Sequence, residues 1–255
     1  MPVLGTVRAI WLNFMRGLVA FPVVWIASFV VHGTLSLFYI KIENDFTFIG
    51  GVLQTLVAIA AGAILAPAAM LTHRFILLGR HEPLRDIVGN RHRLVLYIVL
   101  EASVIAPLMA FLWMGNRLLS HGDSTNGTVF LVIIGSLLVV LLTALWFMLR
   151  AAACFPAIAL DATRDHLSRY WALTRGRVWQ LAAITMLSPF GIASLTWLTF
   201  SLLRAAMEID SDASDNIVFA LWSLVIAYTW VIVMSHVYRV LVQDTATPPD
   251  PNVIR

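Results

Sequence analysis

Long runs of apolar residues, separated by short polar stretches, dominate the pattern along this chain. A helix needs about 20 consecutive apolar residues to cross the roughly 30 Å of hydrocarbon in a bilayer. Six runs reach that length, and they cover residues 18–40, 49–71, 94–114, 128–150, 179–203 and 216–238. The runs lack the alternation of a membrane barrel, and lipid offers the backbone amides no partner, so each run should be helical. The pattern predicts an all-α, polytopic membrane protein with a single domain over residues 1–255.

Composition strengthens this prediction and removes several function classes. Hydrophobic residues make up 60% of the chain and charged residues only 12%, against about 25% charged in ordinary soluble domains. The one cysteine, Cys154, excludes a disulfide framework and a cysteine-based zinc site. The excess of arginine could suggest nucleic acid as a partner, but no separate polar domain exists to carry a duplex-binding surface.

The distribution of basic residues predicts the orientation of the spans. Thirteen of the 17 lysines and arginines fall on one side of the six runs, and only Lys41, Arg117 and Arg204 fall on the other. The positive-inside rule therefore places both termini and the two long basic loops in the cytoplasm of a bacterial inner membrane. The first run is too long for a signal-peptide core, so we expect it to be an uncleaved anchor.

The two basic loops share a pattern that predicts short amphipathic helices on the cytoplasmic face. In each loop, apolar residues recur at helical spacing: Leu84, Ile87 and Val88 in the first, and Leu167, Tyr170 and Trp171 in the second. We expect these residues to dip into the inner leaflet, with arginines at the level of the headgroups. The candidate basic and aromatic elbow consists of Arg91, Arg93, Arg169, Trp171, Arg175, Arg177 and Trp179. These arginines bind anionic phospholipid headgroups or a membrane-protein partner, or they serve only as topology determinants.

Five of the six predicted spans contain a proline or are closely followed by one: Pro22, Pro67, Pro107 and Pro189 lie within their runs, and Pro156 lies six residues after the run at 128–150. Each proline removes one helical hydrogen bond and tends to kink its helix. Ordinary packing kinks are one interpretation, and a hinge or cavity is the other.

Two charged residues lie inside predicted spans. Glu101 is about 12 Å along its helix from Arg93, and Arg150 is about 16 Å from Asp161, so both should reach a similar depth. A charge near the bilayer centre costs about 2.5–3.5 kcal/mol, which favours an ion pair between them. The alternatives are a charged lining for a substrate or proton path, a protonated Glu101, and an Arg150 that snorkels to the phosphates.

Recognisable catalytic and cofactor motifs are missing from the sequence. None of the seven histidines has the spacing of HExxH, and no nucleotide-binding glycine loop is present. A loop metal site remains an alternative, with five candidate ligands: His73, His81, His92, Glu82 and Asp86. We expect a non-enzymatic protein without a cofactor.

A stretch beginning at Arg150 resembles a known family. Arg150, the segment FPAIALD at 155–161 and the segment LSRYWALTRGRVWQL at 167–181 are similar to the membrane domain of glycerophosphoryl diester phosphodiesterases and to YciC-like inner-membrane proteins. The resemblance covers about 30 residues and implies a helical inner-membrane bundle. It does not bring hydrolase activity, because the phosphodiesterase barrel of some relatives is absent here.

These observations favour an envelope-associated scaffold, or a membrane module that interacts with lipid or protein partners through its basic loops. The alternative is a small transporter or lipid-moving protein that uses the proline-kinked helices and Glu101. A cavity that reaches Glu101 would favour the alternative, and a packed interior would favour the scaffold.

Overall fold

The computed structural model describes residues 3–43, 48–79, 81–120, 127–160, 164–177, 179–184, 194, 198 and 212–246. All regular elements in these ranges are helices, which confirms the all-α prediction for the described part of the chain. The helices are α1 (Val3–Ala20), α2 (Pro22–Glu43), α3 (Phe48–Leu78), α4 (Leu84–Gly89), α5 (Arg91–Ser120), α6 (Gly127–Ala151), α7 (Cys154–Ala159), α8 (Arg164–Leu173) and α10 (Asp212–Ala246).

Within the described ranges, four helical segments are long and apolar enough to cross a membrane: Ile49–Leu78, Arg91–Gly115, Ile134–Ala159 and Leu224–Val242. A fifth candidate is the pair Arg8–Gly17 and Pro22–Leu35, if this bent pair is one span. These segments overlap five of the six predicted runs, and most of the run at 179–203 lies outside the described residues. The outer surfaces of α2 and α6 expose Val23, Ile26, Leu131 and Val139, whose exposed fractions are 63–76%. Large exposed apolar surfaces of this kind suit contact with lipid.

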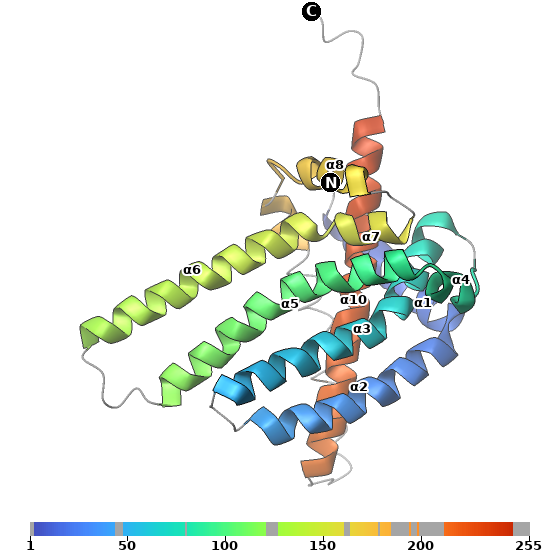
Figure 1. Ribbon diagram of the computed structural model, residues 1–255. Coiled ribbons are helices and arrows are strands. Elements are labelled where there is room, and N and C mark those ends of the chain that lie inside the picture. Colours follow the sequence, from blue (N-terminus) through green and yellow to red (C-terminus); the bar gives the residue numbers. More distant parts are fainter. Residues whose placement is uncertain are drawn as a thin grey trace, which may run out of the picture.

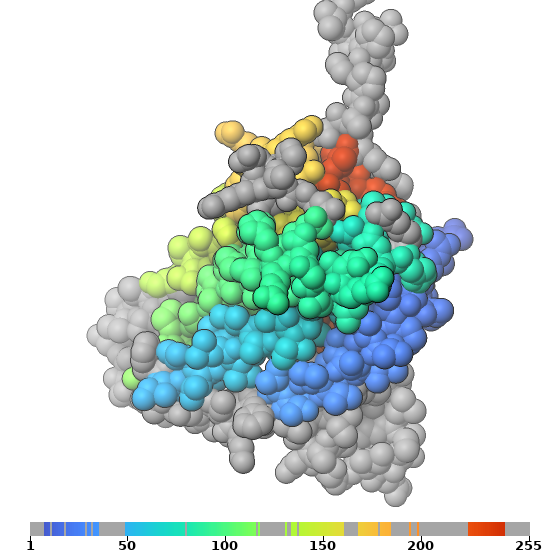
Figure 2. All heavy atoms as spheres, turned by 45° about the vertical axis from the view of Figure 1, so that its right-hand side comes forward, coloured from blue at the N-terminus to red at the C-terminus, as the bar shows by residue number. Residues whose placement is uncertain are grey.

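Helices α2, α3, α5 and α6 lie side by side in one layer, and α10 crosses this layer while contacting α2 and α3 (Figure 1). The space-filling view shows α2, α3 and α5 as adjacent bands (Figure 2). Glycines allow α3 and α5 to approach closely. A Cβ on Gly51 would lie 2.6 Å from Nε1 of Trp113, and a Cβ on Gly62 would lie 2.8 Å from the carboxyl group of Glu101.

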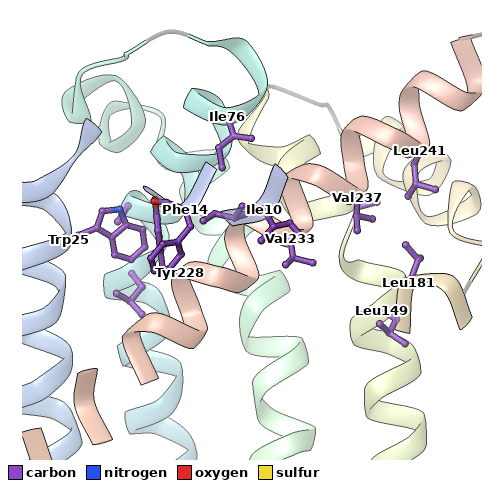
Figure 3. Close-up of a cluster of buried hydrophobic side chains, with 14 residues drawn as sticks. Ile10, Phe14, Trp25, Ile76, Leu149, Leu181, Tyr228, Val233, Val237 and Leu241 are labelled. Atoms are coloured by element: carbon purple, nitrogen blue, oxygen red, sulfur yellow. The ribbon is translucent and has the colours of Figure 1, made fainter. Parts of the chain in front are cut away.

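The junction of α1 and α2 is a sharp bend. The two helix axes differ by 89°, and Pro22 is the first residue of α2. A proline fits this position because its missing N–H would have no helical partner there. The buried residues Ile10 and Phe14 of α1 pack against α10, where the Tyr228 ring lies between Phe14 and Trp25 (Figure 3). The Tyr228 hydroxyl donates to the carbonyl of Phe14 at 3.1 Å and tethers α1 to the last described helix.

Candidate functional site

Two arginines tie together the end of the bundle that carries the predicted cytoplasmic loops. Arg74 of α3 donates to the carbonyl of Ala159 at 3.0 Å and to Oε1 of Glu82 at 3.0 Å, and its Nε lies 2.5 Å from Oε2 of the same carboxylate in an ion pair. Arg239 of α10 donates to the carbonyl of Ile76. These bonds join the C-terminal part of α3 to α7, to α10 and to the segment before α4.

A fully buried histidine links three helices just inside this end. His73 Nδ1 lies 2.7 Å from the Ser235 hydroxyl, and His73 Nε2 lies 3.2 Å from the Tyr97 hydroxyl. Ser235 donates its single proton to the carbonyl of Val231, so it accepts from Nδ1–H, and Nε2 of the neutral ring accepts from Tyr97. Both ring nitrogens of His73 are therefore bonded within the protein.

The described residues contain no group of three or more side chains that could hold a metal ion, so the alternative loop metal site is not formed among them.

Only some side chains of the basic and aromatic elbow are exposed. Arg91, Arg169 and Arg175 are exposed, Arg93 and Arg177 are half-buried, and the Trp179 side chain is 88% exposed. The α8 helix ends at Leu173 in a turn that contains Gly176, whose φ of +78° favours glycine.

The expected membrane-dipping faces of α4 and α8 differ from the prediction. Ile87 is buried within the protein, whereas Leu84 and Val88 are exposed. The Tyr170 hydroxyl of α8 accepts from Tyr238 at 3.1 Å, and the Trp171 ring packs against the end of α6. Leu167, the third residue of the second face, lies outside the residues whose side chains the structure describes. Part of the apolar face of each of these two helices therefore packs against the protein and does not reach lipid.

A cavity of about 320 Å³ lies between the segment after α8 and the C-terminal half of α10. Arg177, Gln180 and His236 supply its polar groups, while Leu181, Ile184, Val237, Val240 and Leu241 form much of the remaining wall. We call this space the elbow cavity. Its mixture of cationic, polar and apolar groups matches the chemistry of a lipid headgroup with adjoining acyl chain.

The structure does not bring Glu101 and Arg150 together as an ion pair among the described residues. The guanidinium carbon of Arg150 lies 5.5 Å from the centre of the Trp146 ring and 5.0 Å from that of Trp171. The α6 helix ends directly after Arg150, at Ala151, and this break leaves the guanidinium against the aromatic rings of α6 and α8. The Arg150 guanidinium thus contacts two tryptophan rings, whereas we expected it to pair with the carboxylate of Glu101.

Glu101 instead lies on the wall of a second cavity of about 210 Å³. Its Oε2 atom is buried and has no hydrogen-bond partner among the described residues. The same is true of the indole Nε1 of Trp25, which lines the same cavity. We call this space the Glu101 cavity. Its other lining residues are Leu65, Ala69, Tyr97, Val104, Ile105, Leu108, Met148, Phe155, Ala227, Trp230, Val231 and Met234.

The prolines occupy different positions in the helices. Pro67 and Pro107 lie inside α3 and α5, and Pro156 lies in α7 just after the break at residues 152–153. Pro189 lies outside the described residues. None of these prolines is among the residues that line the Glu101 cavity.

Sequence reasoning singled out Glu101 but missed Trp25 and Trp230. Tryptophan in membrane helices is enriched at the water interface, so a tryptophan well inside an apolar run was the available signal. Trp230 stands inside the run at 216–238, seven residues or more from either end.

The described residues form a helical protein with segments that are long and apolar enough to span a membrane. No known family model, curated protein or solved structure matches the chain. The resemblance of residues 150–181 to the membrane domain of glycerophosphoryl diester phosphodiesterases and to YciC-like proteins stays a prediction.

Proposed function

We propose that this protein is a bacterial inner-membrane module that binds anionic phospholipid headgroups at its basic end, which faces the cytoplasm. The observation that carries the proposal is the elbow cavity, with Arg177, Gln180 and His236 on its wall and apolar residues beside them. Arg175 and the largely exposed Trp179 flank it. Basic pockets between membrane helices on the cytoplasmic side are known to take anionic headgroups.

The rigid attachment of this end supports the proposal further. Arg239 of α10, the helix that forms one wall of the elbow cavity, donates to the carbonyl of Ile76 and so fixes this helix against α3. Each arginine beside the cavity contributes about 1 kcal/mol when it lies near an anionic surface. Such a module acts as a lipid-dependent scaffold or as the docking surface of a membrane-protein partner, without a catalytic step.

The test compares the thermal stability of the detergent-purified protein with phosphatidylglycerol and with phosphatidylcholine. Wild-type protein should be stabilised more by the anionic lipid, and the double variant Arg175→Gln/Arg177→Gln should lose most of that difference. Two arginines at about 1 kcal/mol each correspond to roughly 30-fold in lipid affinity. The control variant Arg8→Gln/Arg16→Gln removes the same charge from exposed positions on α1, outside the elbow, and should keep most of the response. Equal responses of the two double variants would contradict a specific headgroup site.

A second candidate function is a small transporter or lipid-moving protein. The Glu101 cavity favours it, because the space reaches an intramembrane carboxyl group between α2, α3, α5, α6, α7 and α10. Intramembrane ionisable residues usually mark substrate or ion pathways when they face a cavity.

A further inference from the structure

We infer that the Glu101 cavity is a binding site for a hydrophobic organic monocation, meaning a compact apolar molecule that carries one protonated amine or quaternary ammonium group. The inference rests on the second candidate function and deepens it by naming the ligand class.

The first observation is an uncompensated carboxyl group. No arginine, lysine or histidine is among the described residues that line the cavity, and Arg150, the partner that we expected for Glu101, packs against Trp146 and Trp171. The buried Oε2 of Glu101 lacks a hydrogen-bond donor in the described part of the chain. A charge in the bilayer interior is costly unless it is paired, so a cationic ligand would supply the missing partner.

The second observation is the aromatic wall around this carboxyl group. Four aromatic side chains line the cavity: Trp25, Tyr97, Phe155 and Trp230. Aromatic faces attract ammonium groups through the ring quadrupole, and aromatic cages are the usual protein solution for quaternary ammonium ligands. A carboxylate and several rings around one space therefore favour a cation over an anion or a neutral polar molecule.

The third observation concerns the size and polarity of the space. The cavity holds about 210 Å³, and an apolar protein cavity of about 150 Å³ already accepts benzene. The aliphatic and methionine residues of the wall suit an apolar body of one ring or a short branched chain. The unpartnered indole N–H of Trp25 is available to an oxygen on the same ligand.

The depth of Glu101 distinguishes a free cation from the amine headgroup of a phospholipid. Glu101 lies ten residues from Arg91, where both α5 and its membrane-spanning segment begin, which is about 15 Å along the helix axis. That position is near the middle of the hydrocarbon, well below the headgroups. A free lipophilic amine reaches this depth more readily than a headgroup does.

The experiment measures binding of benzyltrimethylammonium to the detergent-purified full chain by isothermal titration calorimetry. Its uncharged carbon isostere, neopentylbenzene, serves as a competitor of the same shape. Wild-type protein should bind the cation and discriminate against the isostere. Glu101→Gln, which keeps the shape of the side chain, should weaken cation binding roughly tenfold or more. The control Asp86→Asn neutralises an exposed carboxylate on α4 and should leave binding unchanged.

Two further variants keep the test decisive if Glu101→Gln fails to fold. Val104→Phe should fill part of the cavity and abolish binding, and Trp230→Leu should weaken it severalfold by removing one ring. The control Trp179→Leu removes an exposed tryptophan and should bind as the wild type does.

Three results would overturn the inference: no binding of the cation by wild-type protein, unchanged affinity in Glu101→Gln, or equal competition by neopentylbenzene. Native mass spectrometry adds a fourth. Phosphatidylethanolamine that is retained by wild-type protein and lost in Glu101→Gln would assign the cavity to a lipid amine and contradict a free cation. The phosphatidylglycerol response depends on the elbow cavity, so it should survive Glu101→Gln, and failure of one proposal leaves the other standing.

Discussion

Substitution of one small residue should loosen the attachment of α1 to α10. A Cβ on Gly17 would lie 1.9 Å from the hydroxyl oxygen of Tyr228, far inside van der Waals contact. Tyr228 is only 1% exposed, and the rings of Phe14 and Trp25 lie 5.0 and 4.3 Å from its own ring centre. The ring therefore has little room to move, and Gly17→Ala must displace either Tyr228 or α1 itself.

The size of the effect follows from three contributions to the free energy of unfolding. Overpacking a buried site costs about 1–3 kcal/mol, and loss of the hydrogen bond from Tyr228 to the Phe14 carbonyl costs about 1 kcal/mol. Alanine in place of glycine inside a helix returns about 1 kcal/mol. Gly17→Ala should thus destabilise the protein by about 1–3 kcal/mol, measured by SDS titration in mixed micelles with circular dichroism.

A double-mutant cycle tests the physical cause. Tyr228→Phe removes the clashing oxygen and leaves the Cζ carbon of the ring at 3.1 Å from the new Cβ. The variant Gly17→Ala/Tyr228→Phe should therefore be more stable than the sum of the single losses, with a coupling of about 1–2 kcal/mol. Gly135→Ala is the matched control, since a Cβ there meets nothing within 4 Å. Additive losses, or a Gly17→Ala protein as stable as the Gly135→Ala control, would refute this packing of α1.

Two further substitutions test the buried polar contacts. His73→Leu should destabilise the protein by about 1–3 kcal/mol for each hydroxyl that it deprives of a partner, and an SDS midpoint equal to wild type would contradict the network with Ser235 and Tyr97. Arg150→Lys keeps the charge but loses the planar group over Trp146 and Trp171, so it should cost about 0.5–2 kcal/mol. Tryptophan fluorescence should change with it, and an unchanged spectrum and stability would argue against the stacked geometry.

The helical class and the approximate positions of most spans could be predicted because both depend on composition alone. Runs such as 49–71 and 94–114 exceed the thickness of the hydrocarbon, and lipid permits few other structures for them. Helix ends were less predictable. The α3 helix continues to Leu78, seven residues past the predicted span, because His73, Arg74 and Ile76 find partners on other elements.

The partners of the charged residues depended on geometry that the sequence does not carry. Arg150 and Glu101 are at comparable predicted depths, yet depth says nothing about the direction in which a side chain points around a helix. The break after Ala151 and the return of α8 bring Trp171 to Arg150, whereas the absence of a side chain on Gly62 leaves room for Glu101 beside α3. The unpaired indole of Trp25 could not be foreseen either, since its environment is built from helices far apart in the chain.

The bond between Tyr228 and Phe14, which joins residues 214 positions apart, bears on how the protein assembles during translation. At about 5–20 residues per second, α1 would wait on the order of ten seconds or more before its partner helix is synthesised. During that interval the surfaces of α1, α2 and α3 that later meet α10 remain uncovered, so these three helices complete their packing only after α10 has been synthesised.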